Sequence, residues 1–216
     1  VRDPAADALT NVVGSLNVLE AARLAKVEHV VCASTGGALY GDPKTVPADE
    51  ATTIAPLSPY GAAKASVETY LRMYHYTYGL SYTALRYANV FGPRQTPEGE
   101  AGVIAIFTNR MLKGETPVIF GDGEQRRDFV YVGDVARANV NAIERRLQGA
   151  YNVGTGVASS VNEVTRELTA VCGFGGRVDY VEERVGEPRL VTLDASKLAR
   201  EAGWQWQVAL AEGLTL

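Results

Sequence analysis

The amino-acid sequence predicts an α/β fold built on a doubly wound parallel sheet. One observation is the segment HVVCAS at residues 29–34, a short and almost continuous apolar run that is typical of a strand buried on both faces. Another is that such runs alternate along the chain with segments whose apolar residues recur at helical spacing. Because alternating helices and strands bring parallel strands side by side, this order favours a parallel sheet.

The first half of the chain reads in the order helix, strand, helix, strand. Apolar residues at helical spacing predict a helix over residues 3–26, ahead of the first strand. After a loop rich in Gly, Pro and Asp, a second helix is expected over 62–78 and a second strand over 80–90, LSYTALRYANV. In the second helix, four side chains are expected to face the core: Val67, Tyr70, Leu71 and Tyr74.

The second half of the chain alternates shorter elements. Helices are expected around residues 104–112, over 134–146 and in the segment that ends at residue 171. Four short apolar runs are expected to be strands: PVIF, DFVYV, YNVG and VDYVE. No repeat, low-complexity tract or linker interrupts this pattern.

Composition narrows the class of ligand. The chain has 216 residues, 46% of them hydrophobic, so it can bury a full core. A net charge of -4 without a long basic run argues against nucleic acid or an anionic membrane as partner. Cys32 and Cys172 match no metal-ligand spacing, so no metal site is expected. The sequence shows neither a signal peptide nor an apolar run of about 18 residues, and we expect a cytoplasmic protein with a small-molecule ligand.

The stretch SPYGAAK places Tyr60 four residues before Lys64 at the start of a predicted helix. This spacing is about one helical turn, so the two side chains share a face, and an ammonium near a phenol favours the phenolate. A phenol normally loses its proton near pH 10, and lowering that pKa is what a general base for an alcohol requires. The alternative is that Tyr60 only closes a Ser-Pro turn at a helix start.

Two hydroxyls, Ser34 and Thr35, end the first predicted strand. The carboxyl edge of an open α/β sheet is where ligands bind, so a hydroxyl there and the helix-start Tyr60 can contact the same reacting oxygen. The alternative is that these hydroxyls and the glycines after them form a turn.

Eight motifs occur in one order along the chain: NVVGSLNVLEAA, STGGALYG, SPYGAAK, LRYANVFGPRQ, PVIFGDGEQRRDFVYVGDVA, YNVGTG, RVGEPRLVTLDASK and the closing GW. With them, essentially the whole chain resembles the extended short-chain dehydrogenases/reductases, in the NAD-dependent nucleotide-sugar epimerase and dehydratase group, close to UDP-glucose 4-epimerases. The resemblance implies a Rossmann-type sheet, NAD as cofactor and a UDP-sugar as substrate. It also implies a homodimer formed through the helices at 3–26 and 62–78.

By this resemblance, Tyr60 is the catalytic base and acid, and Lys64 lowers its pKa and holds the nicotinamide ribose. Thr35, with Ser34 beside it, would bond the sugar hydroxyl and Ser34 would also lie near the cofactor. Many epimerases place this hydroxyl four residues before the next Tyr-Gly, where the chain has Gly36, so Thr35 is the preferred candidate. The resemblance places two further residues near the cofactor, each with a packing role as the alternative: Asn11 and Tyr87.

The resemblance also implies a set of substrate-binding residues. Asn89 would bond the diphosphate or the sugar, Val118 and Phe120 would sandwich the uracil, and Arg127 and Arg184 would clamp the diphosphate. Arginine suits that task because its planar fork pairs with two oxygens and stays protonated. For Arg126, beside Arg127, the alternative to binding diphosphate is a solvated charge without a ligand.

The position of Val191 is one where glucose-specific epimerases resemble one another in carrying tyrosine. Valine there is expected to leave room for an N-acetyl group at C2 of the sugar. The alternative is that Val191 is an ordinary β-branched residue of a short strand with no contact to the sugar.

The glycine-rich turn YNVGTGVAS, residues 151–159, is predicted not to bind NAD. It lacks the third glycine of the G-x-G-x-x-G pattern, and too few elements follow it to form a βαβ unit. We therefore expect an N-terminal part of roughly 60 to 80 residues, with the pyrophosphate loop, to be missing from the sequence. Residues 1–92 and 124–150 would then be the remainder of the NAD-binding domain. Residues 93–123 and 151–216 would form a smaller α/β lobe that binds the nucleotide sugar.

The function implied by the resemblance is 4-epimerisation through a 4-keto sugar. A 4,6-dehydratase is less favoured, because dehydratases of this family carry Asp-Glu after the catalytic Thr, where this chain has Gly36 and Gly37. A reductase of the same family and a catalytically silent NAD-binding module remain alternatives. The joint presence of Thr35, Tyr60 and Lys64 argues against the silent module, which would need no groups for proton transfer.

Overall fold

The computed structural model describes residues 3–98, 102–183 and 188–216. Its central sheet has three parallel strands in the order β1, β2, β6, with β1 at His29–Thr35, β2 at Ser81–Tyr87 and β6 at Gly149–Val153. The register of the first pair runs from His29 opposite Ser81 to Thr35 opposite Tyr87, so β1 and β2 end together. The predicted α/β fold with a parallel, Rossmann-type sheet is confirmed.

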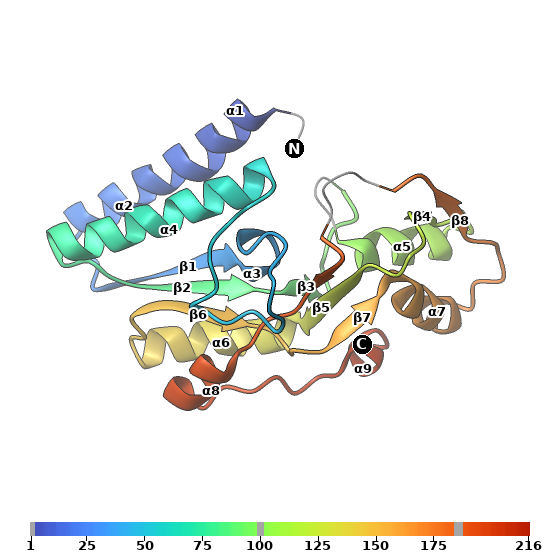
Figure 1. Ribbon diagram of the computed structural model, residues 1–216. Helices are drawn as coiled ribbons and strands as arrows, with labels where there is room; N and C mark the ends of the chain where they lie inside the picture. The colour runs from blue at the N-terminus through green and yellow to red at the C-terminus, as the bar shows by residue number, and fades with distance from the viewer. Residues whose placement is uncertain (1–2, 99–101, 184–187) are drawn as a thin grey trace.

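Helices cover both faces of this sheet (Figure 1). Elements α1 (Pro4–Ala8), η1 (Leu9–Val13) and α2 (Gly14–Leu24) follow one another without a break, and they lie with α4 (Pro59–Tyr78) on one face. Helix α6 (Val132–Glu144) lies on the other. The first predicted helix is therefore confirmed, although η1 is a π-helical turn that the apolar pattern does not reveal.

Helix α4 begins at Pro59 rather than at residue 62, because Ser58 caps it by accepting a hydrogen bond from the Gly61 N–H. Three of the four side chains expected in the core are buried, with Leu71 only 1% exposed. Tyr70 is 37% exposed, so the prediction that it faces the core is wrong. Its position lies at the edge of the apolar stripe, and the buried face extends instead toward Glu68 on the other side.

The other strands of the described residues form one sheet of four strands and one of two, drawn toward the right in Figure 1. In one, β5 pairs with β3 and β9 in parallel and with β7 in the antiparallel direction. In the other, β4 pairs with β8 in parallel. The bounds of these strands are β3 Asn89–Phe91, β4 Val118–Phe120, β5 Arg126–Tyr131, β7 Ala158–Ser160, β8 Asp179–Val181 and β9 Leu190–Val191.

The remaining helices are α3 (Gly36–Leu39), α5 (Val103–Leu112), α7 (Val161–Cys172), α8 (Ser196–Ala202) and α9 (Leu210–Gly213). The strand predicted over 80–90 is interrupted at Ala88, whose N–H bonds to the carbonyl of Val153 at 2.9 Å. This bond extends the pairing of β2 with β6 by one residue, and from Asn89 on β3 pairs with β5 in the next sheet. The carboxyl end of β2 thus leads directly into the four-stranded sheet. Among the described residues, no helix is long and apolar enough to cross a membrane.

Candidate active site

Thr35 and Tyr60 line one cavity of about 380 Å³ at the carboxyl edge of the central sheet. Thr35 is the last residue of β1, and Tyr60 lies in the first turn of α4. The close approach of α4 to α3, the short helix that follows Thr35, depends on Gly61, since a Cβ there would lie 2.6 Å from the carbonyl oxygen of Ala38. The structure thus brings together the hydroxyl and the phenol that the sequence places 25 residues apart.

Lys64 lies one turn after Tyr60. Its Nζ is 5.7 Å from the centre of the Tyr60 ring and donates a hydrogen bond to the Ala33 carbonyl at 3.1 Å. That carbonyl belongs to β1, so the lysine connects the helix that carries Tyr60 to the strand that carries Thr35. An ammonium has three donors, and this bond uses one of them.

Ser34 does not share the environment of Thr35. Its side chain is buried and its Oγ donates to Oε1 of Glu68 at 2.5 Å. Successive side chains of a strand point to opposite faces, so the hydroxyl of Ser34 faces α4 while that of Thr35 lines the cavity. This geometry argues against a direct role of Ser34 toward substrate or cofactor.

Gly36 follows Thr35 directly. A Cβ at this position would lie 2.4 Å from a methyl group of Leu193, a side chain that is 1% exposed. A serine or threonine at position 36 would therefore have to displace a packed leucine. Packing thus disfavours a hydroxyl-bearing residue at position 36, which supports Thr35 as the candidate hydroxyl of this loop.

Tyr87 and Asn11, the other two residues expected near the cofactor, lie on β2 and in η1. Tyr87 ends β2 opposite Thr35, and its hydroxyl is hydrogen-bonded to the Asn139 side chain. Burial raises the pKa of the Tyr87 phenol, which keeps it protonated. Asn11 lies in the π-turn η1 and donates to Asp7 at 3.0 Å.

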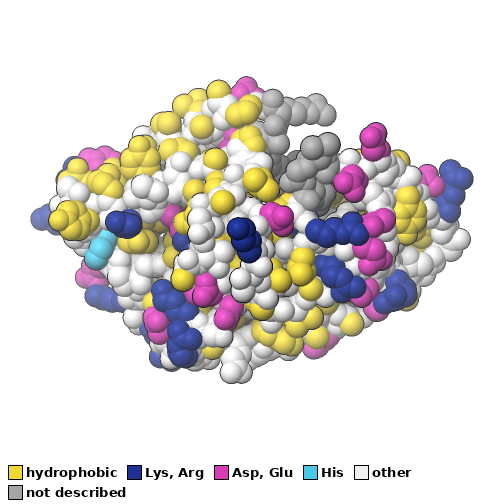
Figure 2. All heavy atoms as spheres, in the orientation of Figure 1, with side chains coloured by type: hydrophobic (Ala, Val, Ile, Leu, Met, Phe, Trp, Pro, Cys, Tyr) yellow, Lys and Arg dark blue, Asp and Glu magenta, His cyan; other side chains and the backbone are white. Residues whose placement is uncertain are grey.

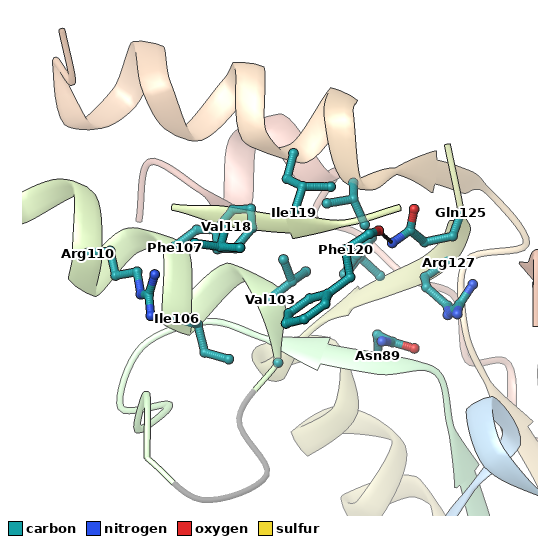
Figure 3. A pocket seen from close by; sticks show the side chains of 13 residues that line it. Asn89, Val103, Ile106, Phe107, Arg110, Val118, Ile119, Phe120, Gln125 and Arg127 are labelled. Atoms are coloured by element: carbon teal, nitrogen blue, oxygen red, sulfur yellow. Dashed lines mark hydrogen bonds between the residues drawn. The ribbon is translucent and has the colours of Figure 1, made fainter. Parts of the chain in front are cut away.

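A second cavity, of about 520 Å³, adjoins the first (Figure 3). Val118 and Phe120 of β4 line it from one side, and α5 lines it from the other. Arg127 and Asn89 line both cavities. A ligand that passes from one cavity into the other must therefore pass a guanidinium and a carboxamide.

Two polar residues of this second cavity were not predicted from the sequence. Arg110 of α5 lines its far end and donates to the Thr116 carbonyl at 3.0 Å. Gln125 donates to the Phe120 carbonyl at 3.0 Å and fixes that strand end (Figure 3). The only signal in the sequence was a cation within the apolar run VIAIFTNRML.

Val191 and Arg184 differ in what the structure shows of them. Val191 lies in β9 as the register partner of Arg127, is 3% exposed and does not line either cavity. Arg184 lies outside the described residues.

The turn after β6 binds a carboxylate of the protein itself. Asp128, 2% exposed, accepts hydrogen bonds from the N–H groups of Thr155, Gly156 and Leu193. Burial raises the pKa of this carboxyl group, although these bonds act in the opposite direction. The turn donors that phosphate would need are thus already used, which agrees with the prediction that YNVGTGVAS is not the NAD site.

Among the described residues, no group of His, Cys, Asp and Glu is placed to hold a metal ion. Cys32 and Cys172 are free and half-buried, and burial raises the pKa of both thiols. Raised thiol pKa values disfavour the reactive thiolate.

The fold and this site place the chain in a class of enzymes. The chain belongs to the NAD dependent epimerase/dehydratase family, whose family model matches residues 1–154. The UDP-glucose 4-epimerase of Thermotoga maritima, solved with UDP-glucose, is similar with a TM-score of 0.95 and 49% identity, over 100% of this chain and 70% of that one. These similarities confirm the family that the motifs indicated.

Two further relatives agree with this assignment. The UDP-glucose 4-epimerase of Thermus thermophilus, solved in complex with NAD, has a TM-score of 0.94 and 44% identity, over 100% of this chain and 71% of that one. The UDP-glucose 4-epimerase of Mycolicibacterium smegmatis is 45% identical over 215 residues, which cover 99% of this chain and 69% of that protein. NAD is the cofactor of this family.

Proposed function

We propose that this protein catalyses the 4-epimerisation of a nucleotide sugar of the UDP-glucose and UDP-galactose type. The observation that carries the proposal is the pair of adjoining cavities with Arg127 and Asn89 at their junction. A nucleotide sugar has its diphosphate between sugar and base. With the diphosphate at Arg127, the sugar lies at Thr35 and Tyr60, and the base lies against Phe120 and the apolar wall.

The residues have distinct tasks in this proposal. Tyr60 takes the proton of the sugar 4-hydroxyl and later returns it, while Thr35 holds the same oxygen. Lys64 stabilises the phenolate and still has donors for a ribose hydroxyl of the cofactor. NAD, when bound beside Tyr60 and Lys64, would supply the hydride chemistry at C4 of the sugar.

The residues at the sheet edge fit the nicotinamide end of NAD. Tyr60, Lys64 and Tyr87 lie at the carboxyl ends of β1 and β2, where ligands of open α/β sheets bind. Asn11 lies in η1, and π-turns of this kind are frequent at functional sites, which supports a place for it near the cofactor. We propose that residues 1–92 and 124–150 belong to the NAD-binding domain, and 93–123 and 151–216 to the substrate-binding lobe.

A dehydratase is the second candidate within the family. Elimination of water across C5 and C6 needs an additional acid and base near the sugar. The two positions after Thr35 are Gly36 and Gly37, and Gly36 is packed against Leu193. These positions supply neither group, so we favour epimerisation.

The proposal is tested by incubating the full-length protein with NAD and UDP-glucose and following the nucleotide sugars by chromatography. We expect UDP-galactose to form until both sugars reach equilibrium. A 4-keto-6-deoxy product would instead identify a dehydratase. Binding of NAD and UDP-glucose without any turnover would identify a catalytically silent module.

We further propose that the protein is a homodimer. Hydrophobic side chains lie over α1, η1, α2 and α4 in Figure 2, and several on these helices are exposed, among them Leu9 at 65%, Val18 at 63% and Leu24 at 66%. A second subunit would bury this apolar surface. Light scattering of the full-length protein at micromolar concentration is expected to give twice the subunit mass, and Val18→Asp to shift it toward the monomer. A monomeric parent protein would contradict the proposal.

Val191 is proposed to determine which sugars react. A tyrosine ring exceeds the space that the buried Val191 fills, so it would have to displace its neighbours. One neighbour is the register partner Arg127, which lines both cavities, and its displacement would narrow the space for the sugar. We expect the parent enzyme to interconvert UDP-GlcNAc and UDP-GalNAc as well as the glucose pair. Val191→Tyr is expected to lower kcat/KM for UDP-GalNAc relative to UDP-galactose by about tenfold or more.

The control for this prediction is Val191→Ile, which adds bulk without a ring. It is expected to keep the parental ratio of kcat/KM for UDP-GalNAc to kcat/KM for UDP-galactose. Thermal unfolding of both variants shows whether the core accepts the larger side chain. If Val191→Tyr folds and its ratio equals that of the parent, Val191 does not control the pocket.

A further inference from the structure

A cluster of buried polar side chains joins α4, which carries Tyr60, to the central sheet, in which Thr35 ends β1. Its members are at most 9% exposed: Ser34, Tyr40, Glu68, Arg86 and Asn152. Arg86 pairs with Glu68 through its NH2 group at 2.6 Å and its Nε at 3.0 and 3.1 Å. Its NH1 group donates to the Tyr40 hydroxyl, which donates in turn to Asn152 at 2.7 Å. The cluster therefore connects helix α4 with all three strands of the sheet.

The Arg86 and Glu68 pair is held firmly as an ion pair. Burial alone would lower the pKa of the Arg86 guanidinium, but the hydrogen bonds and charge of Glu68 outweigh it and raise that pKa. The Arg86 guanidinium therefore stays protonated where it faces the Glu68 carboxyl group. A buried pair of this kind is weak evidence for a contribution to stability, since a well-packed apolar pair is often equally stable.

Glu68 lies on the helix face that carries the catalytic residues. Tyr60, Lys64 and Glu68 follow one another at intervals of four residues along α4. Two bonds from this face reach consecutive residues of β1: Lys64 donates to the Ala33 carbonyl, and Glu68 accepts from the Ser34 hydroxyl. The next residue of β1 is Thr35. Two bonds one turn apart fix how far α4 can slide or turn relative to the end of β1.

We infer that Glu68 is a positioning residue, which through Ser34 and Arg86 holds Tyr60 at its working distance from Thr35. The inference rests on the proposed function, because Tyr60 and Thr35 must contact the same sugar oxygen. Displacing a catalytic group by about 1 Å can cost roughly 100-fold in rate. The substrate-binding residues Arg127 and Phe120 lie on other elements, β5 and β4, and do not depend on this clamp.

The first test replaces the ion pair by an apolar pair in the full-length enzyme, as Glu68→Met/Arg86→Met. This change removes the clamp without changing the net charge near Tyr60. We expect kcat to fall by about 10- to 100-fold, KM for UDP-glucose to stay within about threefold, and the midpoint of thermal unfolding to lie closer to the parent than that of Glu68→Met alone. Parental kcat in a folded double variant would overturn the inference.

The second test is Ser34→Ala, which leaves the ion pair intact and is expected to fold. We expect kcat to fall about fivefold with KM unchanged, as one hydrogen bond of the clamp is lost. In the Glu68→Met/Arg86→Met background the same substitution is expected to have no further effect on kcat, because Ser34 acts through Glu68. If Ser34→Ala lowers kcat by the same factor in the parent and in the double variant, or if it raises KM for UDP-glucose, Ser34 contacts the substrate directly. Either result would overturn the inference.

Tyr60→Phe separates this inference from the proposed function. If Tyr60→Phe is inactive while the clamp variants keep parental kcat, only the role of Glu68 is wrong. If Tyr60→Phe itself remains fully active, the proposed function is wrong.

Discussion

Tyr60→Phe is expected to lower kcat of the full-length enzyme by about 10²- to 10⁴-fold, with little change in the affinity for the nucleotide sugar. The reason is that phenylalanine keeps the ring at the start of α4 and removes the hydroxyl that we propose exchanges a proton with the sugar 4-hydroxyl. Turnover of UDP-glucose measures kcat, and calorimetric titration with UDP measures binding.

Tyr76→Phe is the matched control for this prediction. Tyr76 lies on the same helix and is 92% exposed, so loss of its hydroxyl is expected to leave kcat unchanged. A Tyr60→Phe enzyme with parental turnover would remove the basis of the mechanism.

Arg127→Ala is expected to weaken binding of UDP and of UDP-glucose by roughly 10- to 150-fold. A hydrogen bond to a charged group contributes about 1.5–3 kcal/mol, and the side chain stands where the two cavities meet. Arg127→Lys keeps the charge but loses the planar fork, so its loss of affinity is expected to be intermediate. Titration calorimetry with UDP gives all three dissociation constants.

The neighbouring Arg126 provides the control. It pairs with Glu163 at 3.3 Å and its side chain is 40% exposed, as expected for the solvated charge considered from the sequence. Arg126→Ala is therefore expected to bind UDP like the parent. Equal losses in the two variants would mean that the effect is a general change of surface charge and not a contact with diphosphate.

Much of the fold was predictable because it depends on local patterns. Apolar runs marked the buried strands, and the chain order of helices and strands was sufficient to infer a parallel sheet. The break at Ala88 was not predictable, because it depends on a change of partner strand from β6 to β5, both of which are distant in sequence. Tyr70 was misplaced for a related reason, since the direction of the buried stripe is set by the Glu68 and Arg86 pair.

The candidate site was predictable where helix spacing and strand ends determine position, as for Thr35, Tyr60 and Lys64. The difference between Ser34 and Thr35 required the structure, because it depends on which face of β1 is turned toward α4. Arg110 was missed because a lone cation in an apolar helix has no spacing that signals a ligand. The sequence also did not show that a larger residue at position 36 is disfavoured, because this depends on the packing of Leu193 against Gly36.

The most direct measurement of the central claim uses UDP-glucose that carries deuterium at C4, incubated with the full-length protein and NAD in ordinary water. If the sugar is oxidised and reduced at the same carbon, UDP-galactose forms and retains the deuterium at C4, which mass spectrometry and NMR detect. Deuterium found at C6 of a deoxy sugar would indicate a dehydratase, and deuterium lost to water would indicate proton exchange at C4. Either result, or the absence of UDP-galactose, would contradict the proposed 4-epimerisation.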